Sequence, residues 1–441
     1  MGNTMKSIEI LGGGTVFHVR NHLALTAPAY GTTARFINDI VLEQMYDLVR
    51  DKQIGKYDVS LYLTKMACQG KGNLETNQDI EKLVDKLIAN SDTKIIFFNV
   101  ALVDYEATVL ESGVYKYHWT PDIFPSISGK YEERLKTSDG ERTLRLTPSA
   151  KLISKIRKER KDIFLVGFKT TCGATEDEQF LTGLHLLKSA SCNLVLANDT
   201  KTRTNMIITP EQARYSVTTD RQRVLEELVK MALARSDAHF TRSTVVNGDS
   251  IPWSSHLIPF NLRVVVDHCI KAGAYKPFNG ATVGHFAVKV NSSDFITSKR
   301  KVDFNKLKTI GMVLCRAETE NSVVAFGSKP SVGGQSQRIV FKDHPGTDCI
   351  VHFHCPVIPG MEISTRSQKN FECGSHECGK NTSDGLNEEF PGIKCVYLDN
   401  HGPNIVFNRE IHPQVVIDFI ERHFDLSKST DGIDRNKVSV S

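Results

Sequence analysis

The chain has 441 residues, of which 40% are hydrophobic and 24% charged, and its formal net charge is +4. The length suits two globular domains, the small charge argues against a nucleic-acid partner or an acidic tail, and no apolar run reaches the roughly 18 residues of a membrane span. Ten cysteines spread along the chain predict reduced thiols and a cytoplasmic protein rather than a disulfide framework.

The N-terminal half, residues 1–236, alternates short apolar segments with amphipathic ones, a pattern typical of a parallel sheet with helices on both faces. Apolar residues recur at the helical period over 37–48 and 80–88, and Thr76 with Asp79 resembles a capping box before the second helix. Pro148 suits the first turn of a third helix. We therefore expect an α/β fold with a doubly wound, mostly parallel, Rossmann-like sheet whose strands lie at 8–11, 58–63, 94–103, 162–168 and 193–197.

Two of these strands end in residues that suit a ligand, because open parallel sheets bind ligands beyond the carboxyl ends of their strands. Three glycines precede Thr15. They would let the backbone approach a phosphate to which the Thr15 hydroxyl donates, but a plain turn is the alternative because the Gly-x-Gly-x-x-Gly spacing is missing. Asp104 ends a second strand, where it could bind a nucleotide, hold a magnesium ion, or cap the following turn.

Six short motifs follow one another in this half: Gly13-Gly-Thr15, Ala101-Leu-Val-Asp-Tyr105, Arg134-Leu-Lys136, Thr147-Pro148, Val166-Gly-Phe168 and Ala197-Asn-Asp199. In this order they resemble the phosphopantothenate–cysteine ligase family over residues 5–236. In that family a nucleoside triphosphate activates a carboxylate as an acyl-nucleotidylate, and an amine then displaces the nucleotide.

The resemblance implies that ATP or CTP binds with Mg²⁺ at this edge of the sheet. It implies a charge-stabilising catalytic role for Lys136 on the triphosphate, whereas the residue type alone fits an exposed solubilising lysine equally well. The family's Asn-x-Ser-Ser-Gly loop reads Ala27-Pro-Ala-Tyr-Gly31 here, so its asparagine is replaced. The nucleotide contacts implied by the resemblance are Gly13, Gly14, Thr15, Ala101, Asp104, Phe168 and Asn198.

Residues 237–257 contain turn-forming residues without a clear period, so we expect a linker there. A second domain then spans 258–427, with one helical apolar face over 262–270 and a last helix over 413–424. The polar residues 428–441 predict a disordered tail.

His352 and His354 alternate on an apolar segment that reads as a buried strand. Alternate side chains of a strand share a face, so both rings can point to one spot, and neutral imidazole is a common zinc ligand. His401 lies in a tight turn after a second apolar strand, which could bring a third ring to the same point. Three histidines leave the fourth position of a zinc ion open, as catalytic sites do; the alternative is a set of ordinary buried histidines.

Four short motifs follow one another in this half: Gly284-His-Phe-Ala287, Lys329-Pro-Ser-Val-Gly333, His352-Phe-His354 and Asn400-His-Gly402. They resemble the class II aldolase/adducin family over residues 258–427. The resemblance implies an α/β/α domain with a mainly antiparallel sheet. It also implies a zinc ion on the three histidines, acting as a Lewis acid on a small, phosphorylated carbonyl compound. The family's general acid/base glutamate falls on Gly333, and the implied substrate contacts are Gly284, His285 and Ser331.

The segment Cys373-Gly-Ser-His-Glu-Cys378 lies between the metal motifs. Its cysteines and His376 could hold a second zinc ion, could place a thiolate where the acid/base is missing, or could be ordinary loop residues. Glu377 is the nearest candidate for a substitute catalytic base. Cys355, next to His354, is predicted to point to the opposite face of its strand, into the core.

Three functional hypotheses follow from these features. The first is a bifunctional enzyme that joins a nucleotide-dependent ligase-like half to a zinc-dependent aldolase- or epimerase-like half. In the second, only one half is catalytic and the other is a scaffold or oligomerisation module, and in the third the chain is a non-enzymatic, metal-binding assembly protein. Both resemblances imply small-molecule substrates and self-association to a dimer or tetramer, with neither nucleic acid nor membrane as a partner.

Overall fold

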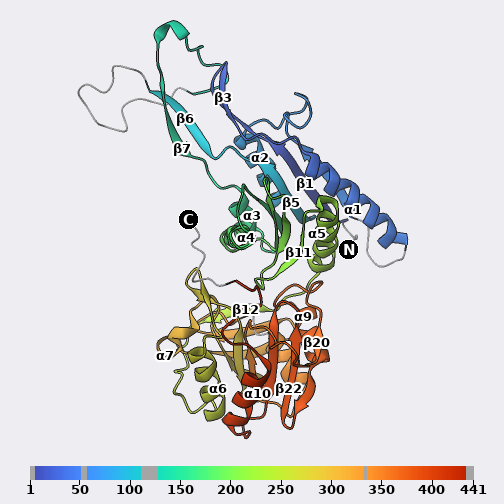
Figure 1. The fold of residues 1–441 in the computed structure, drawn as a ribbon, viewed down its shortest axis with the longest axis vertical. Helices are drawn as coiled ribbons and strands as arrows, with labels where there is room; N and C mark the ends of the chain where they lie inside the picture. The colour runs from blue at the N-terminus through green and yellow to red at the C-terminus, as the bar shows by residue number, and fades with distance from the viewer. Residues whose placement is uncertain (1–4, 51–56, 111–127, 332–334, 434–441) are drawn as a thin grey trace, which may run out of the picture. The chain divides into compact units, whose positions relative to one another are not determined.

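The computed structural model describes residues 5–50, 57–110, 128–331 and 335–433 (Figure 1). The chain forms two compact units. The first consists of Met1–Cys172, His185–Asn205 and Thr218–Ala232, and the second of Gly173–Leu184, Met206–Val217 and Leu233–Ser441. Within the described ranges, no helix has both the length and the apolar character that crossing a membrane requires.

The N-terminal sheet has seven strands in the order β11-β10-β9-β8-β5-β1-β4, and the neighbouring strands from β9 to β4 run parallel. The five predicted strands are found as β1, β4, β5, β8 and β9, whereas β10 and β11 are too short, at 4 and 5 residues, to show a pattern. The strands are β1 (Ser7–Gly14), β4 (Asp58–Leu63), β5 (Thr93–Ala101), β8 (Phe164–Thr171), β9 (Leu194–Asp199), β10 (Asn205–Ile208) and β11 (Arg214–Thr218).

Helices lie on both faces of this sheet, as the alternation of strands and helices predicts. Figure 1 shows α1 and α5 on one side of the strands and α3 and α4 on the other. The capping box is also present, because the Thr76 side chain accepts from the Asp79 backbone and the Asp79 carboxylate accepts from the Thr76 N–H. The helices are α1 (Thr32–Arg50), α2 (Asn77–Ala89), α3 (Ile153–Glu159), α4 (Glu176–Ala190) and α5 (Arg221–Ser236).

Two antiparallel hairpins accompany the sheet: β2 (Val16–Arg20) with β3 (Leu23–Thr26), and β6 (Tyr105–Leu110) with β7 (Thr143–Pro148). Pro148 ends β7 opposite Tyr105, and α3 begins only at Ile153, so the helix start predicted at Pro148 is wrong. Proline lacks a backbone N–H and fits the end of an edge strand as well as the start of a helix.

The second unit contains a ten-stranded, mainly antiparallel sheet, so the fold class predicted for each half is confirmed. Its path is β12-β18-β17-β16-β15-β19-β23-β22-β20, with β21 paired to β22. The strands are β12 (Arg242–Val246), β15 (His285–Lys289), β16 (Asp294–Thr297), β17 (Val313–Thr319), β18 (Ser322–Phe326), β19 (Cys349–His352), β20 (Thr365–Arg366), β21 (Asn387–Phe390), β22 (Ile393–Leu398) and β23 (Gly402–Phe407).

Helices cover the two faces of this sheet, and strand alternation decides which side chains meet them. Cys349 and Val351 of β19 join a core with α6 (Phe260–Lys271) and α10 (Pro413–His423), whereas Ile350 joins a core with α8 (Gln335–Asp343). Since α9 (His376–Gly385) packs against α8, the result is an α/β/α arrangement. The smaller elements are α7 (Leu307–Ile310), the 3₁₀ turn η3 (Phe304–Lys306), and β13 (Pro277–Phe278) with β14 (Ala281–Thr282).

The linker predicted at 237–257 is wrong over much of its length. β12 pairs in parallel with β18, and Trp253 is buried in the core, where its indole N–H donates to Asp267 at 2.9 Å. The strand escaped prediction because it is an edge strand with Val245 and Val246 exposed, so it shows no alternation of polar and apolar residues.

The tail predicted from residue 428 begins later than expected. The Thr430 N–H donates to the His354 carbonyl at 3.1 Å, and Ser429, Asp431 and Ile433 are buried. Packing against another segment, which local polarity does not reveal, fixes these residues. Residues 434–441 lie outside the described residues.

Candidate metal centre

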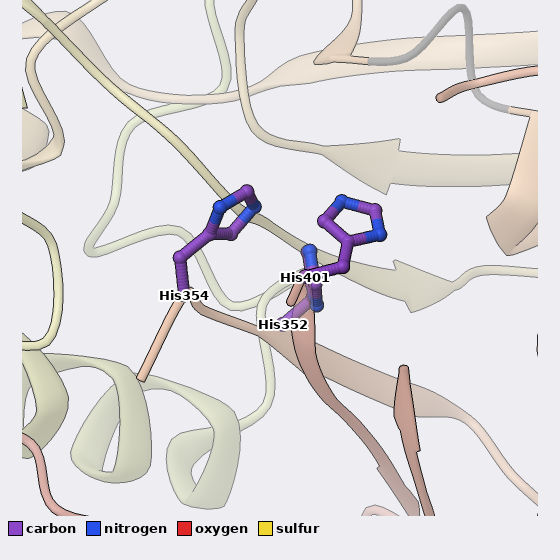
Figure 2. A group of neighbouring side chains, drawn as sticks. All are labelled: His352, His354 and His401. Atoms are coloured by element: carbon purple, nitrogen blue, oxygen red, sulfur yellow. The ribbon is translucent and has the colours of Figure 1, made fainter. Parts of the chain in front are cut away.

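Three buried histidines of the second unit converge on the face of the sheet that carries α8. His352 ends β19, His354 follows it by two residues, and His401 lies in the turn between β22 and β23. One ring nitrogen of each lies within 4.8 Å of the others, and the ring centroids are 4.7–5.0 Å apart. Figure 2 shows the rings gathered around one space. Among the described residues, this is the one cluster of three or more side chains with metal-ligating geometry.

The turn that presents His401 depends on its two neighbours. Gly402 has φ +111°, and a Cβ at this position would lie 2.2 Å from the carbonyl oxygen of Phe353. Glycine alone allows this approach. Asn400 is also left-handed, at φ 58°, a conformation that asparagine tolerates. The turn therefore holds His401 against the strand that carries the other two rings.

Burial keeps the imidazoles of His352 and His401 neutral at pH 7. It lowers the pKa of His352 to about 4, although a hydrogen bond from its Nδ1–H to the Pro403 carbonyl at 2.7 Å opposes the shift. The pKa of His401 lies well below its usual value because of burial and the nearby positive charge of Arg235 and of other histidines when protonated. Since the carbonyl only accepts, Nδ1 of His352 carries the proton and Nε2 keeps a lone pair for a metal.

This donor set fits a zinc ion. Three neutral imidazoles are common zinc ligands, and nitrogen ligands of one tetrahedral ion lie about 3.4 Å apart, so binding would draw the rings inward by side-chain rotation. Nε2 of His285, whose ring centroid lies 4.9 Å from that of His352, is buried without a hydrogen-bond partner within the described part of the chain. Such an atom is uncommon in a folded protein, and a group bound nearby would account for it.

The predicted substrate contacts lie together beside the three histidines. His285 stands opposite His352 on the neighbouring strand, with ring centroids 4.9 Å apart, and the Ser331 hydroxyl donates to the Gly284 carbonyl at 3.4 Å. Burial, with the nearby His352, holds the pKa of His285 well below its usual value. The structure assembles these residues, and their contact with a substrate stays a prediction.

Glu377, the predicted substitute base, lies outside the metal-ligating cluster. Its carboxylate accepts from the His239 backbone N–H at 3.0 Å and contacts the His239 Nδ1 at 2.7 Å. It also lines a cavity of about 870 Å³ together with His376 and Arg338. Its partner His239 lies 138 residues away in the sequence, so no local pattern predicts this contact, and the catalytic role of Glu377 stays a prediction. Gly333 lies outside the described residues.

The predicted Cys-x-x-His-x-Cys zinc site does not assemble, because its three side chains have separate surroundings. Cys373 Sγ is 3.8 Å from Nε2 of His401, and His376 Nε2 is 3.2 Å from the Thr241 hydroxyl. Cys378 is buried against the Gln368 side chain.

Cys355 lies in the core on the opposite face from His354, as predicted. Burial raises the pKa of its thiol to about 12, so this cysteine stays protonated at neutral pH.

In the first unit, the predicted nucleotide residues fall at the carboxyl ends of adjacent strands. Gly13 and Gly14 end β1, and Gly14 pairs with Ala101 at the end of β5. Phe168 and Asn198 lie on the next two strands, β8 and β9. The sheet therefore brings these residues to one edge, as the prediction requires.

The hydroxyl of Thr15, predicted to contact a phosphate, already has hydrogen-bond partners within the protein. The residue is fully buried; its hydroxyl donates to Asn77 Oδ1 at 2.7 Å and accepts from the Val103 N–H at 2.9 Å. The backbone beside it is also close-packed, since a Cβ on Gly14 would lie 1.9 Å from the Ala27 carbonyl oxygen. The glycine run is thus close-packed within this chain, and its contact with a phosphate stays a prediction.

The other two predicted polar residues of this half lie at the surface. Asp104 pairs with Lys151 at 2.6 Å, with both side chains 70% exposed. Lys136 is exposed directly before the 3₁₀ turn η2 (Thr137–Asp139), in the connection from β6 to β7. Neither position excludes a role with a bound nucleotide, and both roles stay predictions.

Sequence reasoning missed a charged cluster near Gly14. Lys65 and Lys130 donate to the carboxylate of Glu75 at 2.9 and 2.8 Å, and these residues line a cavity of about 410 Å³ with Gly14. The two lysines lower the pKa of Glu75 to about 2. No signal was available, because the three residues are scattered along the sequence.

Comparison with known proteins agrees with one of the two resemblances at the level of sequence. Residues 265–409 match the family model described as Class II Aldolase and Adducin N-terminal domain. This range contains His352, His354 and His401, so the resemblance read from the C-terminal motifs is confirmed. No curated protein matches the sequence.

Solved structures similar to this chain fall into two groups. The DNA/pantothenate metabolism flavoprotein from Streptococcus pneumoniae is 19% identical, with 52% of this chain and 99% of that chain covered and a TM-score of 0.42. The C-terminal domain of the coenzyme A biosynthesis bifunctional protein CoaBC is 14% identical, covering 51% and 92%, with a TM-score of 0.33. An L-fuculose 1-phosphate aldolase is 16% identical, covering 38% and 85%, with a TM-score of 0.28. The N-terminal resemblance thus rests on its sequence motifs and on the parallel sheet that carries them.

Proposed function

We propose that the second unit is a zinc-dependent enzyme of the aldolase or epimerase type. Its substrate would be a small hydroxy-carbonyl compound that bears a phosphate, as the family resemblance implies. The observation that carries this proposal is the convergence of three buried imidazoles on one point.

The side chains of this unit have distinct tasks in the proposed reaction. Pro403 fixes the tautomer of His352, and the Gly402 turn fixes the position of His401. A zinc ion held by the three rings would act as a Lewis acid on the substrate carbonyl. His285, beside His352, and Ser331, bonded to Gly284, would contact the substrate.

Metal analysis of the full chain tests this proposal. We expect about one zinc ion per chain, as for a three-histidine site, and its loss in His354→Ala. His256→Ala is the matched control, because His256 is exposed and outside the cluster. A purified chain that takes up no zinc, or a His354→Ala variant that keeps it, would contradict the proposal and favour a scaffold role for this unit.

For the first unit we propose a nucleotide-dependent ligase-like activity that joins a carboxylate to an amine. The support is the ordered set of motifs at the carboxyl ends of β1, β5, β8 and β9, with Lys65 and Lys130 nearby as positive charges for phosphates. Stabilisation against heat by ATP or CTP with Mg²⁺ tests it, since a ligand at 100 times its Kd adds about 2.7 kcal/mol. Absence of such stabilisation would favour the hypothesis that only one half of the chain is catalytic.

Assembly and location are also proposed. We place the chain in the cytoplasm, because none of its ten cysteines forms a disulfide in the structure. Self-association to a dimer or tetramer would complete the sites, as the two resemblances imply. Light scattering of the purified chain tests the oligomeric state.

A further inference from the structure

One cysteine lies at the edge of the three-histidine cluster. Cys373 Sγ is 3.8 Å from Nε2 of His401, on the loop that leads into α9, and the residue is half-buried. The sequence separation is 28 residues, so the fold and not the local chain creates this contact. The position expected to carry a glutamate near the metal is Gly333, which has no side chain to offer.

The distance suits two ligands of the same ion. Zinc binds imidazole nitrogen at about 2.0–2.1 Å and thiolate sulfur at about 2.3 Å, so in a tetrahedral site the two atoms lie about 3.6 Å apart. The distance of 3.8 Å between Cys373 Sγ and His401 Nε2 agrees with this value to about 0.2 Å. Very little movement of this pair is therefore needed for both atoms to bind one ion.

The loop that carries Cys373 is fixed by a buried arginine. Arg235 donates to the Lys369 carbonyl at 2.9 Å and to the carboxylate of Glu372 at 3.4 Å. Glu372 directly precedes Cys373 in the sequence. Glu211 holds the other side of the guanidinium at 2.8 Å, and Arg235 is 1% exposed. Burying three charges is costly, and Arg235 acts here as a positioning residue for the loop.

We propose that Cys373 is the fourth ligand of the metal ion held by His352, His354 and His401. On binding, the thiol proton passes to solvent and the thiolate closes a His₃Cys coordination sphere. A chelating hydroxy-carbonyl substrate would then displace the thiolate, which would take up a proton from solvent and return to the thiol–imidazole contact with His401 at 3.8 Å. This inference rests on the proposed metal site and adds the identity of its fourth ligand.

Cobalt substitution tests the proposal on the full chain. A thiolate bound to Co²⁺ gives an intense near-ultraviolet charge-transfer band, which histidine ligands do not give. We expect this band in the unmodified chain and in Cys378→Ser, and its loss in Cys373→Ser, which should keep the weaker visible bands of a histidine site. Cys378 is the matched control because it lies five residues further on, buried against Gln368 and away from the histidines.

Zinc affinity, measured by competition with a chromophoric chelator, gives a second readout. We expect Cys373→Ser to weaken zinc binding by at least about tenfold, with Cys378→Ser unchanged. Acetohydroxamate, a bidentate oxygen ligand, should abolish the charge-transfer band of the unmodified chain if the thiolate is exchangeable. A band that persists at saturating acetohydroxamate would contradict the exchange.

The outcomes separate this inference from the proposed function. Visible cobalt bands without a charge-transfer band in the unmodified chain would overturn the role of Cys373 and leave the three-histidine site intact. Absence of any cobalt or zinc binding would overturn both. A thermal melt of each variant shows whether it is folded, and Cys373→Ala offers a second replacement if the serine variant is not.

Discussion

The predicted sites of the two units differ in what their side chains already do. At the sheet edge of the first unit, the Thr15 hydroxyl is bound to Asn77 and Val103, and Asp104 is paired with Lys151. In the second unit, three buried rings face one another, and Nε2 of the neighbouring His285 has no protein partner among the described residues. In this chain the motifs predict the fold of both units, whereas buried polar groups without a hydrogen-bond partner indicate where a ligand binds.

The largest expected effect lies in the support of the metal centre. Arg235→Met would leave Glu211 and Glu372 buried without their cation, so we expect the free energy of unfolding to fall by about 3–5 kcal/mol. Arg316→Met is the control, because the Arg316 side chain is 56% exposed in its pair with Asp294, so its loss should lower stability much less. Denaturant unfolding measures both, and equal stabilities for the two variants would refute the buried clamp.

Thr15→Ala tests whether the Thr15 hydroxyl of the first unit stabilises the fold or contacts a ligand. Removing the hydroxyl deletes two buried hydrogen bonds, one to Asn77 and one from the Val103 N–H, each worth about 0.5–1.5 kcal/mol, so we expect a loss of about 1–3 kcal/mol of stability without any ligand. Thr15→Ser, which keeps the hydroxyl, should lose less. If Thr15→Ala is as stable as the unmodified chain but binds nucleotide poorly, Thr15 is a ligand contact after all.

Glu75 gives a pH dependence of defined sign. Its folded pKa of about 2 lies below the ordinary value of 4.5, so its contribution to stability is present above pH 4.5 and is lost as the pH falls towards 2. Allowing for screening by solvent, we expect Glu75→Gln to lower stability by about 1–2 kcal/mol at pH 7. The difference from the unmodified chain should vanish near pH 2, and a constant difference across this range would contradict the assignment.

The smallest stability effect is expected for Asp104. Its ion pair with Lys151 is exposed, so Asp104→Asn and Lys151→Gln should each change stability by less than about 0.5 kcal/mol. If Asp104 contacts nucleotide, only Asp104→Asn should reduce the thermal shift given by ATP or CTP. Equal shifts in both variants would remove Asp104 from the proposed site.

The sequence predicts those features that depend on the periodicity of apolar residues and on the order of short motifs. Five parallel strands, the capping box at Thr76 and the shared face of His352 and His354 all follow from repeats of two or about 3.6 residues. Partners distant in the chain do not: Glu377 with His239, Arg235 with Glu372, and Cys373 with His401 arise only when segments are brought together. β12 was not predicted because it is an exposed edge strand, whose sequence does not alternate between polar and apolar residues.

The central claim is that three imidazoles bind one zinc ion. Anomalous diffraction at the zinc absorption edge, from crystals of the full chain grown with zinc, tests it most directly. We predict a single strong peak about 2.0–2.1 Å from a ring nitrogen of each of His352, His354 and His401. A peak elsewhere, or none between these rings, would contradict the account.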